Sequence, residues 1–281
     1  GCYEVVEVLE LQEKEECKMD HFVDERDYKL LESDKYTFFV LRRIMDGPCK
    51  LLLSDHERLI ICFSTEPFPT WIWTADDATE EEMEKAYQLV VENNLMDKQH
   101  TFNIKYELAD YFIKRALKDG IHLSLTTNLF AYDCPNPIKP DKMAEGEVCK
   151  CEMKDMEELA DFIEMFHDET RVDQMDRKGC LEHAEFKIKE GKTYFWTDSE
   201  GNHVATCAYT LKGELASIGM VFTRPEYRRN HFAENLVYQV TEMAKAEGCL
   251  PMLYTDADYA ASNACYEKIG YILQGKLCMI G

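Results

Sequence analysis

Three arginines lie in one short polar segment of a chain whose formal net charge is −22. Arg224, Arg228 and Arg229 follow a predicted strand over residues 215–223 and precede a predicted helix over 232–247. The first amides of a helix have no intrahelical acceptor, and the helix dipole is positive at that end. Such a turn can hold a pyrophosphate through backbone donors. The alternative is that these arginines are surface residues of an ordinary loop.

A second segment of interest covers residues 256–271, with the sequence Asp-Ala-Asp-Tyr-Ala-Ala-Ser-Asn-Ala-Cys-Tyr-Glu-Lys-Ile-Gly-Tyr. It predicts a short helix over 262–269, ended by Gly270. Tyr266 and Ile269 are three residues apart and share a helix face, which alone would indicate two core residues.

Together the two segments resemble the GNAT superfamily of acyl-CoA-dependent N-acetyltransferases. The acetyl-CoA signature of that superfamily is Arg/Gln-x-x-Gly-x-Gly/Ala. Arg228 matches its first position and Ala233 its sixth, whereas His231 replaces the usual glycine. Glycine lets the backbone approach a phosphate without a Cβ atom, so this replacement bears directly on the cofactor site.

The segment 256–271 resembles the family's Asn-x-x-Ser-Asn-x-x-Tyr-x-x-Ile-Gly-Tyr pattern. Asn263 and Tyr266 fall on matching positions, and Tyr259 stands where the first asparagine is usual. The resemblance implies that Asn263 contacts the CoA arm. It also implies that Tyr266 is the general acid that protonates the departing thiolate, for which its hydroxyl must lie within hydrogen-bond reach.

The resemblance further implies acetyl-CoA as co-substrate and no metal. The amide of Val221 would bind the thioester carbonyl and the developing oxyanion. Phe222 and Thr223 would pair along the pantetheine. The remaining cofactor-binding residues, which include the matched arginine and the amides expected around the pyrophosphate, are Arg228, Arg229, Asn230, His231, Phe232, Ala233 and Glu234.

The general base that deprotonates the acceptor amine stays open. Glu169, Glu214 and Asp256 are candidates, and water could relay the proton instead. Residues 166–170, Phe-His-Asp-Glu-Thr, invite a metal site, but a helix end with polar residues is favoured. In the family the equivalent loop lines the acceptor site, so this segment is expected to set specificity.

A chain of 281 residues favours two packed domains. Pro135, Pro137 and Pro140 each remove a backbone donor and mark a linker over 135–145. We expect an α/β fold in which a GNAT acetyltransferase domain over 146–281 has a mixed, mostly antiparallel sheet flanked by helices. Residues 1–134 repeat the order of elements and are interpreted as a degenerate GNAT-like α/β domain, with an unrelated α/β cap as the alternative.

Hydrophobic periodicity and turn residues predict the individual elements. Thr79 and Glu82 have the spacing of a capping box. Predicted helices cover 25–43, 79–94, 106–118, 155–167, 173–190, 232–247 and 262–269. Predicted strands cover 51–53, 59–63, 71–74, 121–132, 147–153, 192–197, 203–211, 215–223, 251–255 and the segment from 271 onward.

The composition limits the classes of molecule that the protein is expected to bind. The charge of −22 repels nucleic-acid backbones and is compatible with a cationic amine acceptor. The twelve cysteines include no Cys-x-x-Cys pair, which favours free thiols in a reducing compartment. No apolar run has the length of a membrane span, so the expected location is cytoplasmic, without membrane contact. The oligomeric state, monomer or homodimer, stays open.

Three functional hypotheses follow. The leading one is an N-acetyltransferase that moves acetyl from acetyl-CoA to a primary amine of a small molecule or peptide. The second, motivated by His231 and Tyr259, is a non-catalytic acyl-CoA-binding or regulatory protein of the same fold. The third is an interaction module that uses the acidic N-terminal half.

Overall fold

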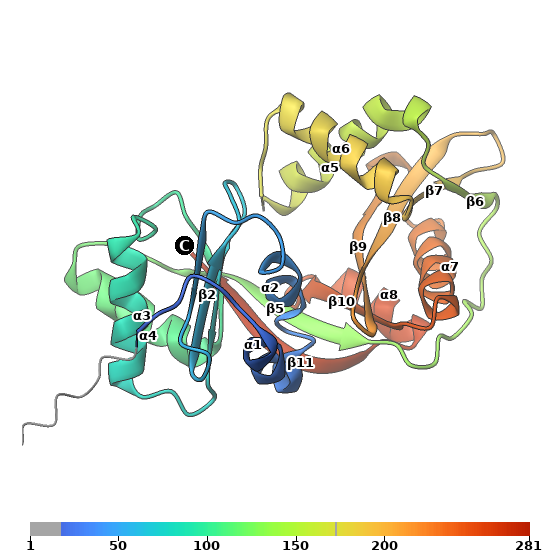
Figure 1. The fold of residues 1–281 in the computed structure, drawn as a ribbon. Helices are drawn as coiled ribbons and strands as arrows, with labels where there is room; N and C mark the ends of the chain where they lie inside the picture. Colours follow the sequence, from blue (N-terminus) through green and yellow to red (C-terminus); the bar gives the residue numbers. More distant parts are fainter. Residues whose placement is uncertain (1–17, 172) are drawn as a thin grey trace, which may run out of the picture.

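The computed structural model describes residues 18–171 and 173–281 and contains one sheet of eleven strands (Figure 1). The strand order is β1-β2-β3-β4-β11-β5-β10-β9-β8-β7-β6. The strands are β1 (Leu51–Ser54), β2 (Leu59–Phe63), β3 (Thr70–Thr74), β4 (Phe102–Ile104), β5 (Leu125–Asp133), β6 (Glu147–Lys150), β7 (Thr193–Thr197), β8 (His203–Lys212), β9 (Leu215–Thr223), β10 (Leu250–Asp256) and β11 (Ile272–Ile280).

Helices cover both faces of this sheet. They are α1 (Glu25–Leu31), α2 (Phe39–Ile44), α3 (Glu80–Glu92), α4 (Tyr106–Lys118), α5 (Met156–Thr170), α6 (Arg177–Glu190), α7 (Phe232–Ala246) and α8 (Ala260–Ile269), with 3₁₀ turns η1 (Glu32–Asp34), η2 (Met153–Asp155) and η3 (Pro225–Tyr227). None of these described helices combines the length and hydrophobicity that crossing a bilayer requires.

The two halves of the chain have the same topology. Strands β1, β2 and β3 are antiparallel neighbours, α3 follows, and β4 returns parallel to β3. In the second half β7, β8 and β9 are antiparallel neighbours, α7 follows, and β10 returns parallel to β9. The mixed, mostly antiparallel sheet flanked by helices that the sequence predicts is confirmed, and the same order of elements occurs twice.

The centre of the sheet is built by an exchange of strands between the halves. The last strand of the first half, β5, pairs with β10 of the second, while the last strand of the chain, β11, pairs with β4 of the first. The two exchanged strands also pair with each other along most of their length. Each half therefore completes its sheet with a strand from the other, and the linker over 135–145 stays a prediction.

Alternating side chains divide each half into two cores. In β2, Ile61 and Phe63 pack against α3 and α4, whereas Ile60 and Cys62 pack against α1 and α2. In the second half, α7 and α8 cover one face and α5 and α6 cover the other, as Figure 1 shows. The second half thus has two separate faces on which ligands can be held.

Local sequence signals account for most element ends. Thr79 caps α3, and the reciprocal bonds between Thr79 and Glu82 confirm the capping box. Gly270 ends α8 with φ of 107°, and a Cβ there would lie 2.7 Å from the carbonyl oxygen of Asn136, so glycine is required.

Two element predictions were wrong. The helix expected over 25–43 is broken into α1, η1 and α2, because Phe38 and Phe39 at the break pack into two different cores. The strand β4 was missed, since three residues are too short to show a period of two.

The cysteines that the structure describes are all free thiols. Cys149 and Cys151 pack into the same core, beneath α5 and α6, as their spacing predicts.

Candidate functional site

The strands β9 and β10 separate where the cofactor is expected. Their parallel pairing ends at Ile218 and Leu253, and the described residues beyond it on β9 have no partner on that side. The other edge of β9 has a bulge against β8, where Met220 has a φ of 51° and its carbonyl accepts a hydrogen bond from Thr206 Oγ1 at 2.9 Å. The bulge and the separation leave the backbone around Val221 open toward β10.

Unpaired backbone donors follow at the start of α7. The chain leaves β9 through η3 and then enters the helix at Phe232. Among the described residues, the N–H groups of 229–234 donate to no protein acceptor, and no side chain caps the helix. Consecutive free amides at a helix start form an anion site.

The shape of this turn explains the usual glycine of the signature. His231 has a φ of 63° and Arg229 a φ of 68°, both in the left-handed region that glycine adopts without strain. A side chain in that region costs about 1 to 2 kcal/mol. The imidazole of His231 lies outside, with Nδ1 at 3.3 Å from Glu234 Oε2, and the amide of His231 remains unpaired.

The side chain of Arg228 is engaged within the protein. Its guanidinium donates to the carbonyl of Thr223 at 3.0 Å and makes a two-pronged salt bridge to Glu169 at 3.0 and 2.6 Å. The arginine thereby fixes the end of β9 to the end of α5. Arg229 has an exposed side chain for which the structure shows no partner among the described residues, so it is the free cation beside the turn.

Phe222 and Thr223 lie at the end of β9, beside the separation. Phe222 is buried beneath α5 and pairs with Thr206 of β8. The hydroxyl of Thr223 is buried without a hydrogen-bond partner. The backbone of both residues is therefore held on the β8 side, and their β10 side is open.

Tyr266 lies in the core beneath α7, and Val221 packs against the same core. Its ring is 8% exposed, and its hydroxyl has no hydrogen-bond partner among the described residues. Burial raises the pKa of the Tyr266 phenol, and the neighbouring thiols of Cys265 and Cys207 add to that rise. Cys207 lies opposite the bulge, so the free hydroxyl of Tyr266 belongs to the same region as Val221.

Asn263, in the first turn of α8, is held by residues that precede the helix. Its amide nitrogen donates to the carbonyl of Ala257 at 3.1 Å, and its amide oxygen accepts from Thr255 Oγ1 at 2.9 Å. The residue therefore fixes the connection from β10 to α8. Tyr259, at the end of that connection, is exposed, and its hydroxyl lies 3.5 Å from Glu169 Oε1.

The candidate bases differ in their surroundings. Glu169 is paired with Arg228, and Asp256 accepts from the amide of Asp258 at the exposed end of β10. Glu214 precedes β9, where a backbone hydrogen bond and the neighbouring Arg42 and Lys35 lower the pKa of its carboxyl. Seven residues of extended strand, about 23 Å, separate position 214 from position 221.

Asp173 was not among the candidate residues, and its pKa departs from the ordinary value. It lies between α5 and α6, and burial raises its pKa to about 6. The segment 166–170 is the last turn of α5, as the favoured alternative held.

A small cavity lies on the opposite face of the same strands. Its volume is about 130 Å³, and its walls come from α2, α6, β8 and β9. Gly219 and Met220, beside the bulge, contribute to it together with Arg43 and Lys187. Nothing in the spacing of these residues predicts their meeting, because Arg43 comes from the first half of the chain.

The equivalent turn in the first half has the opposite charge. The start of α3 is preceded by Asp76 and Asp77 and carries three glutamates in its first turn. The capping box satisfies its amides, and the acidic side chains repel an anion. The first half therefore lacks the features that make the start of α7 an anion site.

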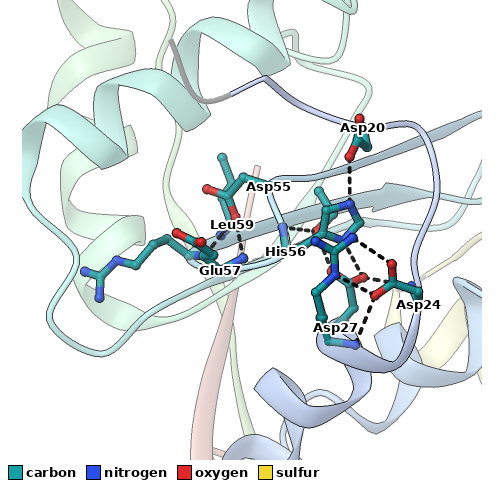
Figure 2. A network of polar contacts seen from close by, with 10 residues as sticks. Asp20, Asp24, Asp27, Asp55, His56, Glu57 and Leu59 are labelled. Atoms are coloured by element: carbon teal, nitrogen blue, oxygen red, sulfur yellow. Dashed lines mark hydrogen bonds and ion pairs between the residues drawn. The ribbon is translucent and has the colours of Figure 1, made fainter. Parts of the chain in front are cut away.

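Figure 2 shows a second polar cluster, at the turn between β1 and β2. His56 Nδ1 lies 2.7 Å from Asp27 Oδ2, and its Nε2 lies 2.9 Å from Asp20 Oδ2. Ser54 Oγ donates to the other oxygen of Asp27. Asp24, Asp27 and His56 are residues of the kinds that bind metals, and they lie close together. Both ring nitrogens of His56, however, are already engaged by carboxylates. This cluster joins α1 to the hairpin.

A second group with metal-ligand chemistry is Asp155, Glu158 and His203. Glu158 pairs with His203 Nδ1 at 2.8 Å and with Arg224 at 3.3 Å. Its two carboxylate oxygens therefore already join α5 to the start of β8 and to the residue after β9.

Comparison with known proteins identifies the second half. Residues 156–271 match the family described as Acetyltransferase (GNAT) family, and the match includes the bulge, the turn before α7 and Tyr266. A search of curated proteins found no significant match.

Solved structures share the fold over most of the chain. A Drosophila protein is 14% identical with a TM-score of 0.69, and the similarity covers 93% of this chain and 97% of that one. A GNAT-family acetyltransferase from Colwellia psychrerythraea is 11% identical with a TM-score of 0.57, covering 94% and 98%. A GCN5-related N-acetyltransferase from Kribbella flavida is 14% identical with a TM-score of 0.54, covering 79% and 86%. The arrangement of two halves therefore recurs in other proteins.

Proposed function

Because residues 156–271 form a domain of the GNAT acetyltransferase family, we propose that this protein transfers an acetyl group from acetyl-CoA to a primary amine of a small molecule or peptide. The observation that carries the proposal is the run of unpaired amides over 229–234, next to strands that separate. Free donors, a positive helix end and Arg229 suit a pyrophosphate, which an acidic surface would otherwise repel.

Different residues of the site would bind different parts of acetyl-CoA. The amides of 229–234 would hold the pyrophosphate, and the open edges of Phe222 and Thr223 would pair along the pantetheine. Arg228 acts as a positioning residue, because its guanidinium fixes the carbonyl of Thr223 and ties the turn to Glu169. Asn263 has the same kind of role at the β10–α8 connection, on the other side of the opening.

Acetyl-CoA supplies an acyl group activated as a thioester. The amide of Val221, at the bulge, stabilises the negative charge that develops on the carbonyl oxygen when an amine attacks. The Tyr266 phenol, whose pKa is raised by burial, is protonated at neutral pH, and its hydroxyl would give a proton to the departing sulfur. The attacking amine would lose its proton to water or to one of the candidate carboxylates. Both reactants are held side by side, which supplies a further part of the acceleration.

The direct test is acetyl transfer to a panel of primary amines, followed through release of the CoA thiol. Tyr266→Phe removes only the hydroxyl from a buried ring that has no hydrogen-bond partner, so the fold should remain intact. Loss of a general acid typically lowers kcat by about 100-fold or more. We expect that loss with an unchanged dissociation constant for acetyl-CoA, measured by calorimetry.

Tyr132→Phe is a matched control, because Tyr132 is another buried tyrosine of the same core. It should leave kcat unchanged. Equal activity of Tyr266→Phe and the native protein would remove the acid role from Tyr266. Acetyl-CoA binding without transfer to any amine would support a non-catalytic acyl-CoA-binding protein instead.

A further inference from the structure

The cavity of about 130 Å³ lies on the face of β8 and β9 that is covered by α6 and α2, opposite α7. Gly219 and Met220 bring it to the bulge, which is the proposed point of transfer. An amine seated there would meet the carbonyl group through the opening between β9 and β10, while the co-substrate enters from the α7 side. The cavity is well below the roughly 300 Å³ of sites for drug-sized ligands, so it suits a small molecule or a small end of one.

Arg43 is the unusual member of this cavity. The guanidinium makes no hydrogen bond or salt bridge within the described residues, and its Nε is fully buried without a partner. Burial lowers the pKa of Arg43, and the charges of Glu190 and Tyr254 oppose this shift without reversing it. Arg43 is partly exposed, but a buried donor without a partner is costly to the folded state, so its unpaired Nε calls for a function.

The other polar groups around Arg43 are the cationic Lys187, the neutral His183 and the carboxylate of Glu190, which Lys187 engages. Lys187 donates to Thr210 Oγ1 at 3.3 Å and lies 3.6 Å from Glu190, so it is already engaged. Burial and the neighbouring Lys187 lower the pKa of His183 to about 4, which leaves its imidazole neutral.

These observations point to an anion as the missing partner of Arg43. A guanidinium presents a planar fork of donors that matches a carboxylate with two parallel hydrogen bonds. The apolar part of the lining, from Phe39, Val40, Ala208 and Met220, leaves room for a short carbon skeleton.

We propose that the acceptor is a small amine that also carries a carboxylate, as in an amino acid, and that Arg43 binds this carboxylate. The inference rests on the proposed acyl transfer and specifies its substrate class. Arg43 thereby determines specificity, because it orients the acceptor so that the amine lies at the bulge. An acceptor without the anionic group would leave the guanidinium without a partner and its Nε buried, as in the free protein.

The experiment compares acceptors in matched pairs: alanine with ethylamine, and serine with ethanolamine. Phosphoethanolamine is included as an amine with a different anion. The measured quantity is kcat/KM for each amine at saturating acetyl-CoA. We expect the amino acids to exceed their decarboxylated counterparts on the order of 10- to 100-fold, the contribution of hydrogen bonds to a charged group.

Arg43→Met should abolish this preference and leave acetyl-CoA binding unchanged. It should also keep or raise the melting temperature, since an apolar side chain of similar length replaces a partly buried guanidinium that has no partner among the described residues. Arg42→Met is the matched control, because Arg42 lies on the same helix but is directed to Glu214 and does not line the cavity. It should retain the preference.

The outcomes separate this inference from the proposed function. Transfer to ethylamine as efficient as to alanine would overturn the carboxylate assignment and leave acyl transfer intact. A preference for phosphoethanolamine over the amino acids would also overturn it, in favour of a phosphate. A preference for amino acids that survives in Arg43→Met would remove Arg43 from the site. Absence of acetyl-CoA binding would instead contradict the proposed function itself.

Discussion

At the scale of single residues, the cofactor turn is governed by two backbone conformations. Arg229 and His231 both adopt positive φ, and this curls the chain so that the amides of 229–234 remain free. The sequence marks this position only by a histidine in place of a glycine. The structure shows that the imidazole lies outside the turn. The replacement of glycine by His231 therefore strains the backbone but leaves the backbone amides of 229–234 free to donate.

His231→Gly should therefore stabilise the protein. Glycine removes the left-handed strain of about 1 to 2 kcal/mol but adds flexibility to the unfolded chain, so the expected net gain is roughly 0.5 to 1 kcal/mol. The free energy of unfolding in urea measures it. His231→Ala, which keeps a Cβ, should show no such gain, and a destabilised glycine variant would mean that the imidazole contact with Glu234 outweighs the strain.

At the scale of elements, the ends of helices could be predicted from local sequence signals, whereas contacts between elements far apart in the sequence could not. The side chains of Thr79 and Glu82 form the capping box that marks the start of α3, and Gly270 marks the end of α8. The exchange of β5 and β11 depends on pairings such as Ile104 with Cys278, which no local pattern encodes. The same holds for the cavity, where Arg43 of α2 meets Lys187 of α6.

The polar cluster of Figure 2 links elements in a pH-dependent way. Burial opposes protonation of His56, but the hydrogen bonds to Asp27 and Asp20 outweigh it and raise its pKa. A group whose pKa is higher in the folded state adds stability below its unfolded value, near 6.5, and loses that contribution as pH rises through the folded value.

His56→Asn tests this link, because asparagine also tolerates the φ of 63° found at this position. The difference in unfolding free energy between the native protein and the variant should be largest at pH 6 and shrink at alkaline pH. A difference that grows with pH would contradict a protonated His56 in the folded state.

At the scale of the whole molecule, the exchanged strands join the two halves into one sheet. Leu277 of β11 is fully buried in the core beneath α1 and α2, and Ala131 of β5 packs beside Leu215 and Met252 of the second half. Neither half can keep its sheet once the other unfolds, because each would lose a central strand. Figure 1 shows the two long strands running between the halves.

We expect one calorimetric unfolding transition for both halves. Leu41→Ala in the first half and Leu236→Ala in the second each remove a fully buried side chain, at a cost of about 2 to 5 kcal/mol. Each variant should lower the melting temperature of the entire transition. Two transitions, each moved by only one of the variants, would show that the halves unfold independently.

The central claim, that the free amides before and within the first turn of α7 bind acetyl-CoA, is tested most directly by calorimetric titration of Ala233→Pro. Proline is tolerated in the first turn of a helix and deletes one N–H that has no protein acceptor. Glu81→Pro makes the same change in α3, the equivalent helix of the first half. We predict binding by the native protein, unchanged binding by Glu81→Pro, and a loss on the order of 10-fold or more in Ala233→Pro. Absence of binding to the native protein, or equal binding by Ala233→Pro, would contradict the account.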